Sequence, residues 1–376
     1  MTETVKGFRD FTGEEAEKKS EIKGIIKNVF EKYGFEYAET PLIEREEFVK
    51  SGNENDEAIS DIFKLKDKGK RNLALRYEFT FQLKRLMKNK KLPYKRYQVG
   101  EVFRDEPVSS NRLRQFTQCD ADVINSTIKD EAEILAMANE ILKKLGIEPI
   151  ILVNNRKLLN EILDDLKIKK NKEQVLREID KFDKISEKEL KANLKKLKAE
   201  KILDALKQKE DYFNKFESYR EIISLRDYCR TYGIKVLFSP TVVRGLSYYN
   251  ENVFEIKAKG IRETIVAGGS YVFDGIQCTG ISLGLERLLV LAKIKIENEK
   301  YLVVSLGEDK KAIALAQKLR GLGKIVSIYY GKPTKALEYA NAYKIGKVIF
   351  VGEKEIKSGK FKVKDMKSGK ESLLRV

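Results

Sequence analysis

The sequence predicts an α+β protein: a unit built on an antiparallel sheet and interrupted by a helical insertion, followed by a smaller α/β unit. The chain has 376 residues and a mass of 43.3 kDa, which is too long for one ordinary hydrophobic core. Strand patterns in the first 300 residues include a long hairpin, which favours antiparallel pairing. In residues 301–376 strands alternate with helices, which favours a largely parallel sheet.

The first elements follow from hydrophobic spacing and turn residues. Residues 14–33 place apolar side chains at helical spacing, and Gly34 follows as a C-cap. A short strand, FEYAE, is broken by Pro41. The same criteria predict strands over 73–80, a hairpin within 97–124 and a helix over 128–145.

Composition changes in the second half of the chain. Residues 165–215 are rich in Lys, Glu, Asp and Leu with almost no Gly or Pro, which predicts a helical insertion with solvated faces rather than a catalytic segment. Strands are expected over 234–239, 253–258 and 263–267, a buried helix over 281–292, a linker over 293–300, and helices over 309–321 and 333–343.

These elements predict four segments. Residues 1–164 and 216–297 form the two parts of the sheet-based unit, residues 165–215 form the insertion, and residues 301–376 form the terminal unit.

The charge balance predicts a polyanionic partner. Lys and Arg number 75 against 58 Asp and Glu, giving a net charge of +17. Residues 301–376 hold 17 basic and 7 acidic residues, so the excess is concentrated there. A basic terminal unit of this kind is typical of nucleic-acid binding, and the alternative is a generic lysine-rich surface.

Composition also excludes several kinds of chemistry. The chain contains no histidine, which rules out Ser-His-Asp and Cys-His pairs, HExxH metal sites and imidazole acid–base catalysis. The cysteines Cys119, Cys229 and Cys278 are not clustered, which favours a reducing cytoplasm and no metal site built on histidine or cysteine. No apolar run reaches the length of a membrane span, and no secretory signal is expected at the start.

The segment LRYEFT carries one candidate site. If residues 73–80 form a strand, Arg76, Glu78 and Thr80 share one face. A carboxylate and a hydroxyl together could hold an ammonium group. A half-exposed antiparallel strand explains the alternation equally well.

The hairpin carries a second candidate site. Arg104 and Glu106 share a face of its first arm, and Arg112, Arg114, Phe116, Gln118, Asp120 and Asp122 share a face of its second arm. Gln115, Thr117, Cys119, Ala121 and Val123 occupy the other, mostly apolar face. Arginine forks match phosphates, and a ring among them could stack on a base, so we predict a nucleotide platform rather than a solvated face.

Three later segments add candidates. Arg244 stands at a glycine-containing turn before Tyr248 and Tyr249, which point to opposite sides if the chain is extended. Gly268 and Gly269 allow close backbone approach to a ligand. Arg287 lies on an otherwise apolar helix and requires an anionic partner, either a ligand or an acid of the protein.

Taken in order, these segments resemble the class II aminoacyl-tRNA synthetases, and specifically the histidyl-tRNA synthetase family. The matching text is KGFRDF, the proline of motif 1 in ETPLIE, LRYEFT, motif 2 in FRDEPVSSNRLRQFTQCDAD, the histidine signature in VRGLSYY, AGGSY, and motif 3 in GLERL. The last residues resemble the class IIa anticodon-binding domain. LRYEFT and QCDAD are more similar to the archaeal and eukaryotic branch than to the bacterial one.

The resemblance implies a histidine-binding set. Glu78, Thr80 and Gln118 would hold the α-ammonium group of histidine. Asp122 and Tyr249 would bind the imidazole, and Tyr271 would close the pocket. The implied set is Glu78, Thr80, Gln118, Asp122, Tyr248, Tyr249 and Tyr271.

It also implies an ATP-binding set: Arg104, Glu106, Arg112, Phe116 and Arg287. Arg104 would bridge the histidine carboxylate and the α-phosphate, Glu106 would read the adenine edge, and Phe116 would stack on the ring. Arg112 and Arg287 would grip the outer phosphates. Arg104 and Arg244 are the implied catalytic residues, with Arg244 neutralising charge on the α-phosphate.

The resemblance implies ATP-dependent ligation of histidine to tRNA through histidyl-adenylate, by a cytoplasmic homodimer, with Mg²⁺ accompanying ATP. Two alternative interpretations are a regulatory subunit of ATP phosphoribosyltransferase and a catalytically inactive RNA-binding sensor. The chain departs from the family at Ser247, where an acid is usual, and at Ser270, where the family motif GGRYDG has arginine.

Overall fold

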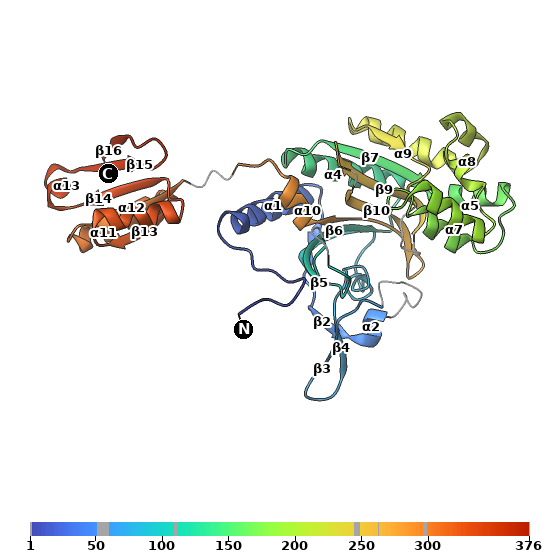
Figure 1. Cartoon of the computed structure of the whole chain (residues 1–376), viewed down its shortest axis with the longest axis horizontal. Coiled ribbons are helices and arrows are strands. Elements are labelled where there is room, and N and C mark those ends of the chain that lie inside the picture. The colour runs from blue at the N-terminus through green and yellow to red at the C-terminus, as the bar shows by residue number, and fades with distance from the viewer. Residues whose placement is uncertain are drawn as a thin grey trace. The chain divides into compact units, whose positions relative to one another are not determined.

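The computed structural model describes residues 2–50, 60–108, 112–243, 249–261, 263–295 and 299–375. The chain divides into two compact units, Met1–Ile294 and Lys295–Val376, here called the sheet unit and the terminal unit (Figure 1). Arg244 and Tyr248 lie outside the described residues.

Eight strands of the described residues form the main sheet of the sheet unit, in the order β1-β5-β6-β11-β10-β9-β7-β8. Only the pairs β1·β5 and β7·β8 are parallel. The strands are β1 (Glu36–Tyr37), β5 (Tyr94–Phe103), β6 (Gln115–Ile124), β7 (Pro149–Asn155), β8 (Val236–Phe238), β9 (Tyr249–Ala258), β10 (Thr264–Phe273) and β11 (Ile276–Gly284). The predicted antiparallel sheet is confirmed.

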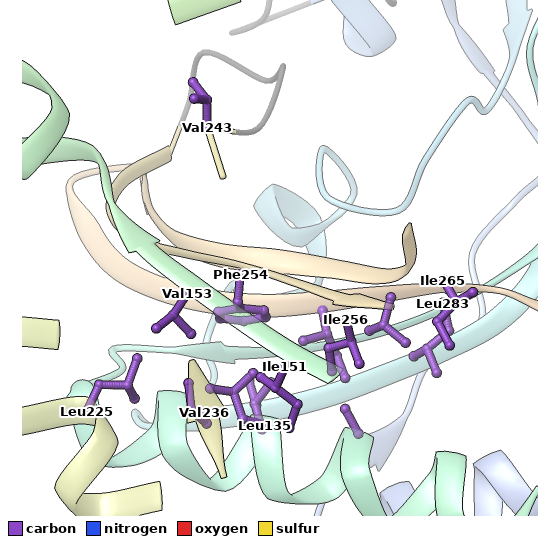
Figure 2. Packing of buried hydrophobic residues seen from close by; sticks show 14 of the residues in the cluster. Leu135, Ile151, Val153, Leu225, Val236, Val243, Phe254, Ile256, Ile265 and Leu283 are labelled. Carbon is purple, nitrogen blue, oxygen red and sulfur yellow. The ribbon is translucent and has the colours of Figure 1, made fainter. Parts of the chain in front are cut away.

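Helices cover one face of this sheet. They include α1 (Gly13–Lys32), α4 (Ile128–Lys144) and α9 (Tyr219–Thr231). α4 begins with a reciprocal capping box, in which Thr127 and Asp130 satisfy each other's backbone N–H groups. Figure 2 shows Leu135 of α4 and Leu225 of α9 beside the strand residues Ile151, Val153, Phe254 and Ile256.

Strand β6 has two faces of opposite character, as its alternation predicts. Cys119, Ala121 and Val123 are fully buried in the core beneath the helices. The neighbouring side chains of the strand, Gln118 and Asp120 among them, therefore point to the opposite face of the sheet. That face carries the candidate site.

The prediction of a strand over 73–80 is correct only at its start. β4 (Asn72–Leu75) pairs with β2 (Ile43–Arg45) and β3 (Lys64–Lys66) in a separate small sheet, and residues 76–82 are irregular. The carbonyl of Tyr77 accepts a hydrogen bond from Arg104 Nε (3.1 Å), and that of Phe79 accepts one from Arg96 Nη2 (3.1 Å). Arginine side chains thus take the place of a partner strand.

Helices occupy the segment predicted as an insertion and the region around it. They are α5 (Arg156–Asp165), α6 (Lys172–Ile179), α7 (Glu187–Lys196), α8 (Ile202–Leu206) and the 3₁₀ helix Glu210–Lys215. Leu176, Leu190 and Leu194 are buried in the same hydrophobic cluster as α1 and α4. The insertion is therefore packed on the sheet unit through its leucines.

The helix predicted over 281–292 is shorter than expected. Residues 281–284 belong to β11, and α10 covers Leu285–Leu291. A short apolar run fits a buried strand and a buried helix equally well, and pairing with β6 decides the first four residues. None of the helices in the described ranges is long and apolar enough to cross a membrane.

The terminal unit contains a five-stranded sheet in the order β13-β12-β14-β15-β16. Its parallel strands are β12 (Lys300–Ser305), β13 (Ile325–Tyr330) and β14 (Lys347–Val351), and its antiparallel strands are β15 (Lys360–Asp365) and β16 (Glu371–Arg375). Helices α11 (Asp309–Gly321), α12 (Pro333–Ala342) and α13 (Glu353–Ser358) connect the strands. The alternation as far as β14 and the helix over 309–321 are confirmed, but the expectation of a largely parallel sheet was only partly correct because β15 and β16 pair antiparallel.

Candidate active site

The candidate site lies on the polar face of β5, β6, β10 and β11. Gln118, Asp120 and Asp122 of β6 are each 5% exposed. Gly280 of β11 is paired with Asp122, and a Cβ atom at Gly280 would lie 2.2 Å from Asp122 Oδ1. Glycine is thus required at this position to leave room for the carboxyl group.

Asp122 is held between a hydroxyl and a guanidinium. Tyr271 Oη donates to Asp122 Oδ1 at 2.6 Å, and Arg96 Nη2 lies 2.8 Å from Asp122 Oδ2. Burial raises the pKa of Asp122, and Arg96 opposes that rise. Burial also raises the pKa of Tyr271, so this phenol remains a donor.

Glu78 stands at the start of the irregular segment, close to Arg104. Its Oε1 accepts a hydrogen bond from the backbone N–H of Phe81 at 3.0 Å, and its carboxyl group also bonds to Thr80. Burial raises the pKa of Glu78, while these hydrogen bonds and Arg104 lower it. A carboxyl group so placed gains stabilisation as an anion when a cation binds beside it.

Arg104 links this segment to the hairpin. Its Nε donates to the Tyr77 carbonyl, its Nη2 donates to Gln118 Oε1 at 3.3 Å, and its guanidinium carbon lies 5.2 Å from the centre of the Phe116 ring. A guanidinium has five N–H groups, and these two hydrogen bonds use two of them. Arg104, the Phe116 ring and the Gln118 amide therefore lie together on this face.

The remaining predicted ATP residues lie at more exposed positions. Arg112 Nη1 is 3.0 Å from Glu106 Oε2, and the Arg112 side chain is 58% exposed. Arg287 is exposed and donates to the backbone carbonyl of Thr264 at 2.6 Å, so the expectation of a buried arginine was wrong. Its helix turns the apolar side chains of Leu285 and Leu288 inward instead.

Tyr249 lies opposite Tyr271 where β9 pairs with β10. Gly269 has φ +156°, and a Cβ atom there would lie 2.9 Å from Tyr249 Cδ1. A Cβ atom at Gly268 would lie 2.1 Å from the Gly280 carbonyl oxygen. The glycine pair therefore leaves room for the protein's own strand and for the Tyr249 ring.

Sequence reasoning did not identify Arg96 as a site residue, nor Glu131 as the partner of Ser270. Ser270 Oγ donates to Glu131 Oε1 at 2.5 Å, on the side of β10 opposite Tyr271. The change from the family's arginine to Ser270 therefore leaves the Tyr271–Asp122 contact in place. The alternation of side chains along β5, together with its register against β6, would have placed Arg96 beside Asp122, but that register was not known from the sequence.

Comparison with known proteins gives two family matches. A family model described as histidyl-tRNA synthetase matches residues 7–288, and one described as an anticodon binding domain matches residues 300–376. The chain is 32% identical to a histidine–tRNA ligase 1 of Bacillus cereus over 98% of this chain and 96% of that protein. It is 35% identical to the histidine–tRNA ligase of Wolinella succinogenes over 97% and 94% of the two chains.

Two solved structures resemble the chain along most of its length. The histidyl-tRNA synthetase of Nostoc sp. PCC 7120 has a TM-score of 0.86 and 26% identity, with 100% of this chain and 97% of that chain covered. A Bacillus halodurans protein described as an ATP phosphoribosyltransferase regulatory subunit/histidyl-tRNA synthetase has a TM-score of 0.74 and 20% identity, covering 93% and 98% of the two chains. At that identity the second likeness shows a shared fold alone.

Proposed function

Because the chain belongs to the histidyl-tRNA synthetase family, we propose that the polar face around Asp122 is the pocket in which it binds its amino acid. The enzyme ligates histidine to tRNA with the use of ATP. The observation that carries the pocket assignment is the Asp122 carboxyl group, which is buried and held by Tyr271 and Arg96.

Within this pocket, charge and hydrogen bonding assign the two ends of histidine. Glu78, Thr80 and Gln118 supply acceptor oxygens for the α-ammonium group, which has donors only. Asp122 accepts the N–H of one imidazole nitrogen, and Tyr249 meets the other. A site built to hydrogen-bond a polar ring rejects apolar competitors by roughly 10⁴–10⁵-fold, so no editing domain is needed.

ATP binds along the Arg104 side of the pocket. Phe116 stacks on the adenine ring and Glu106 accepts from its exocyclic amine. Arg104 bridges the histidine carboxylate and the α-phosphate, while Arg112 and Arg287 contact the outer phosphates. Mg²⁺ arrives with the triphosphate, since this ion is usually held by substrate phosphates plus one or two carboxylates.

The reaction has two steps. A carboxylate oxygen of histidine forms a bond to the α-phosphorus as the bond to the pyrophosphate oxygen breaks, which gives histidyl-adenylate and pyrophosphate. A ribose hydroxyl of the tRNA terminus then attacks the acyl carbon and AMP leaves. The attacking carboxylate is already ionised, so the first step needs no protein base, and Arg104 and Arg244 neutralise developing charge.

The oligomeric state and the cellular compartment complete the proposal. The enzyme is a homodimer whose interface includes the motif 1 segment, where Tyr37, Leu42 and Ile43 are 44–48% exposed. It works in the cytoplasm, where its three cysteines, all free and buried, would stay reduced. Light scattering of the full chain tests the first feature, since a monomer mass at micromolar concentration would contradict it.

Histidine-dependent ATP–pyrophosphate exchange tests the proposed function. We expect exchange with histidine and with none of the other standard amino acids, whereas a regulatory subunit or an inactive sensor would give none. Arg244→Ala should abolish exchange and leave tRNA binding nearly unchanged. Unaltered exchange in that variant would remove Arg244 from its role.

A further inference from the structure

Two buried ionisable groups lie beside the residues proposed to contact histidine. Arg96 of β5 is 0% exposed and is paired in register with Asp122. Asp120 of β6 is 5% exposed and follows Gln118 on the same face of the strand. The ATP- and histidine-binding roles set out above use neither of them.

Asp120 determines which end of the Gln118 amide faces the pocket. Gln118 Nε2 donates to Asp120 Oδ2 at 2.7 Å, which leaves Gln118 Oε1 on the side of Arg104. A reversed amide would set an oxygen against the Asp120 oxygen and an NH₂ group against the arginine. Because an ammonium group can only donate, Gln118 can bind it only with the amide in the observed orientation.

Arg96 holds the other contact residue. Its Nη2 is 2.8 Å from Asp122 Oδ2 and also donates to the Phe79 carbonyl, which ties the irregular segment to the carboxyl group. Within the described ranges, its Nε and Nη1 atoms have no hydrogen-bond partner. A buried ion pair with incomplete hydrogen bonding is often no more stable than apolar residues of the same volume. Stability is therefore a poor explanation for this pair.

We propose that Arg96 and Asp120 are positioning residues for histidine recognition. Arg96 fixes the Asp122 carboxylate so that it accepts the imidazole N–H. Asp120 fixes the Gln118 amide so that its oxygen accepts from the α-ammonium group. This inference rests on the proposed histidine pocket and names the residues that set its hydrogen-bonding polarity.

The Asp120 arm is tested by comparing Asp120→Ala with Asp120→Asn in pyrophosphate exchange by the full chain, with histidine and ATP titrated separately. Loss of one hydrogen bond to a charged substrate group weakens binding by roughly 10-fold to 100-fold. We expect Asp120→Ala to raise KM for histidine by at least about tenfold, with KM for ATP nearly unchanged. Asp120→Asn keeps an oxygen for Gln118 Nε2 and should restore most of the loss.

The Arg96 arm is tested with the double variant Arg96→Met/Asp120→Asn. Arg96→Met alone would leave Asp120 and Asp122 buried without a cation and could fail to fold. The double variant removes one acid together with the arginine. We expect KM for histidine to rise well beyond its value in Asp120→Asn. The control is Arg156→Met, which removes another buried arginine, one whose guanidinium is paired with the more exposed Glu173 (2.5 Å) among the helices. It should lower the melting temperature without raising KM for histidine.

Equal increases in both KM values, or an Asp120→Ala enzyme with an unchanged KM for histidine, would overturn the Asp120 arm. A double variant no worse than Asp120→Asn would overturn the Arg96 arm. Wild-type protein without histidine-dependent exchange would instead refute the proposed function itself, so the two failures are distinguishable.

Discussion

The main sheet buries carboxyl groups in two places, and their partners differ. On the face of β5 and β6, Asp122 lies 2.8 Å from the guanidinium of Arg96. On α4, Glu131 receives Ser270 Oγ at 2.5 Å and Asn252 Nδ2 at 2.6 Å, both from neutral groups. A cation can keep a buried acid ionised, whereas neutral donors compensate burial only in part.

The two places also differ in what their contacts connect. The Asp122 carboxyl group, held by Arg96, is the one proposed to accept a substrate N–H. Glu131 instead joins elements: Asn252 of β9 is bonded to Asn155, which in turn is bonded to Glu221 of α9 at 2.7 Å. Burial raises the pKa of Glu131 to about 7. The comparison teaches that a guanidinium holds the acid proposed to contact the substrate, whereas neutral groups hold an acid that connects the helices to the sheet.

The largest expected effect comes from displacing Asp122 without changing it. Gly280→Ala places a methyl group 2.2 Å from Asp122 Oδ1, so the carboxyl group must move. A misplacement of about 1 Å can cost about 100-fold in rate, and we expect histidine-dependent exchange to fall by about that factor. Gly24→Ala on α1 is the control, since its Cβ would meet nothing within 4 Å. Equal activity of the two variants would contradict the role of Asp122.

At the Glu131 site, a truncation should reduce stability more than substrate binding. Glu131→Ala leaves the Ser270 and Asn252 donors without their acceptor, which should lower the free energy of unfolding by about 2–4 kcal/mol. Urea denaturation measures that change, and exchange kinetics measure KM for histidine. A tenfold rise in KM without loss of stability would place Glu131 in the substrate site.

The pH dependence of stability gives the next effect. The folded-state pKa of Glu131, about 7, is higher than its unfolded value of about 4.3, so the folded state binds the extra proton between these values. Its stabilising contribution is complete below the unfolded pKa and is lost as the pH rises through the folded pKa. Between pH 4.5 and pH 8, the free energy of unfolding of the wild type should fall by up to about 3 kcal/mol relative to that of Glu131→Gln. A constant difference measured by thermal denaturation would show that Glu131 is ionised throughout.

The smallest effect concerns a single donor to the same acid. Ser270→Ala removes one of the two hydrogen bonds to Glu131 and should cost about 1 kcal/mol. Because that bond lowers the pKa of Glu131, its loss should also move the stability transition to higher pH. Destabilisation by several kcal/mol would mean that Ser270 supports more of the pocket than this one contact.

Local patterns in the sequence predicted the elements but not the contacts between distant residues. Alternation along β6 assigned Asp122 to the polar face and Cys119 to the core correctly. The strand predicted over 73–80 ends at Leu75, and Arg96 and Arg104 of the hairpin bind carbonyls of the residues that follow. No local pattern reports such a contact.

The partners of Asp122 and Glu131 could not be predicted from the sequence for the same reason. The Arg96–Asp122 pair depends on the register of β5 against β6, and Ser270 lies 139 residues from Glu131. The roles of individual residues came from the ordered motifs of the family rather than from spacing. The contact residues of the pocket could therefore be anticipated from the sequence. The residues that orient them could be identified only from the folded structure.

The arginine contacts to residues 76–80 have a consequence for motion. Arg76 itself donates to the carbonyls of Glu101 (2.8 Å) and Thr40 (2.6 Å), so side chains at both ends and in the middle fasten this irregular stretch to the hairpin and its neighbours. Although it lacks a strand partner, its backbone should be as well ordered as that of β5, which NMR order parameters measure. The amine-binding end of the pocket would then be rigid before substrate arrives. Binding of histidine would therefore cost this segment little conformational entropy.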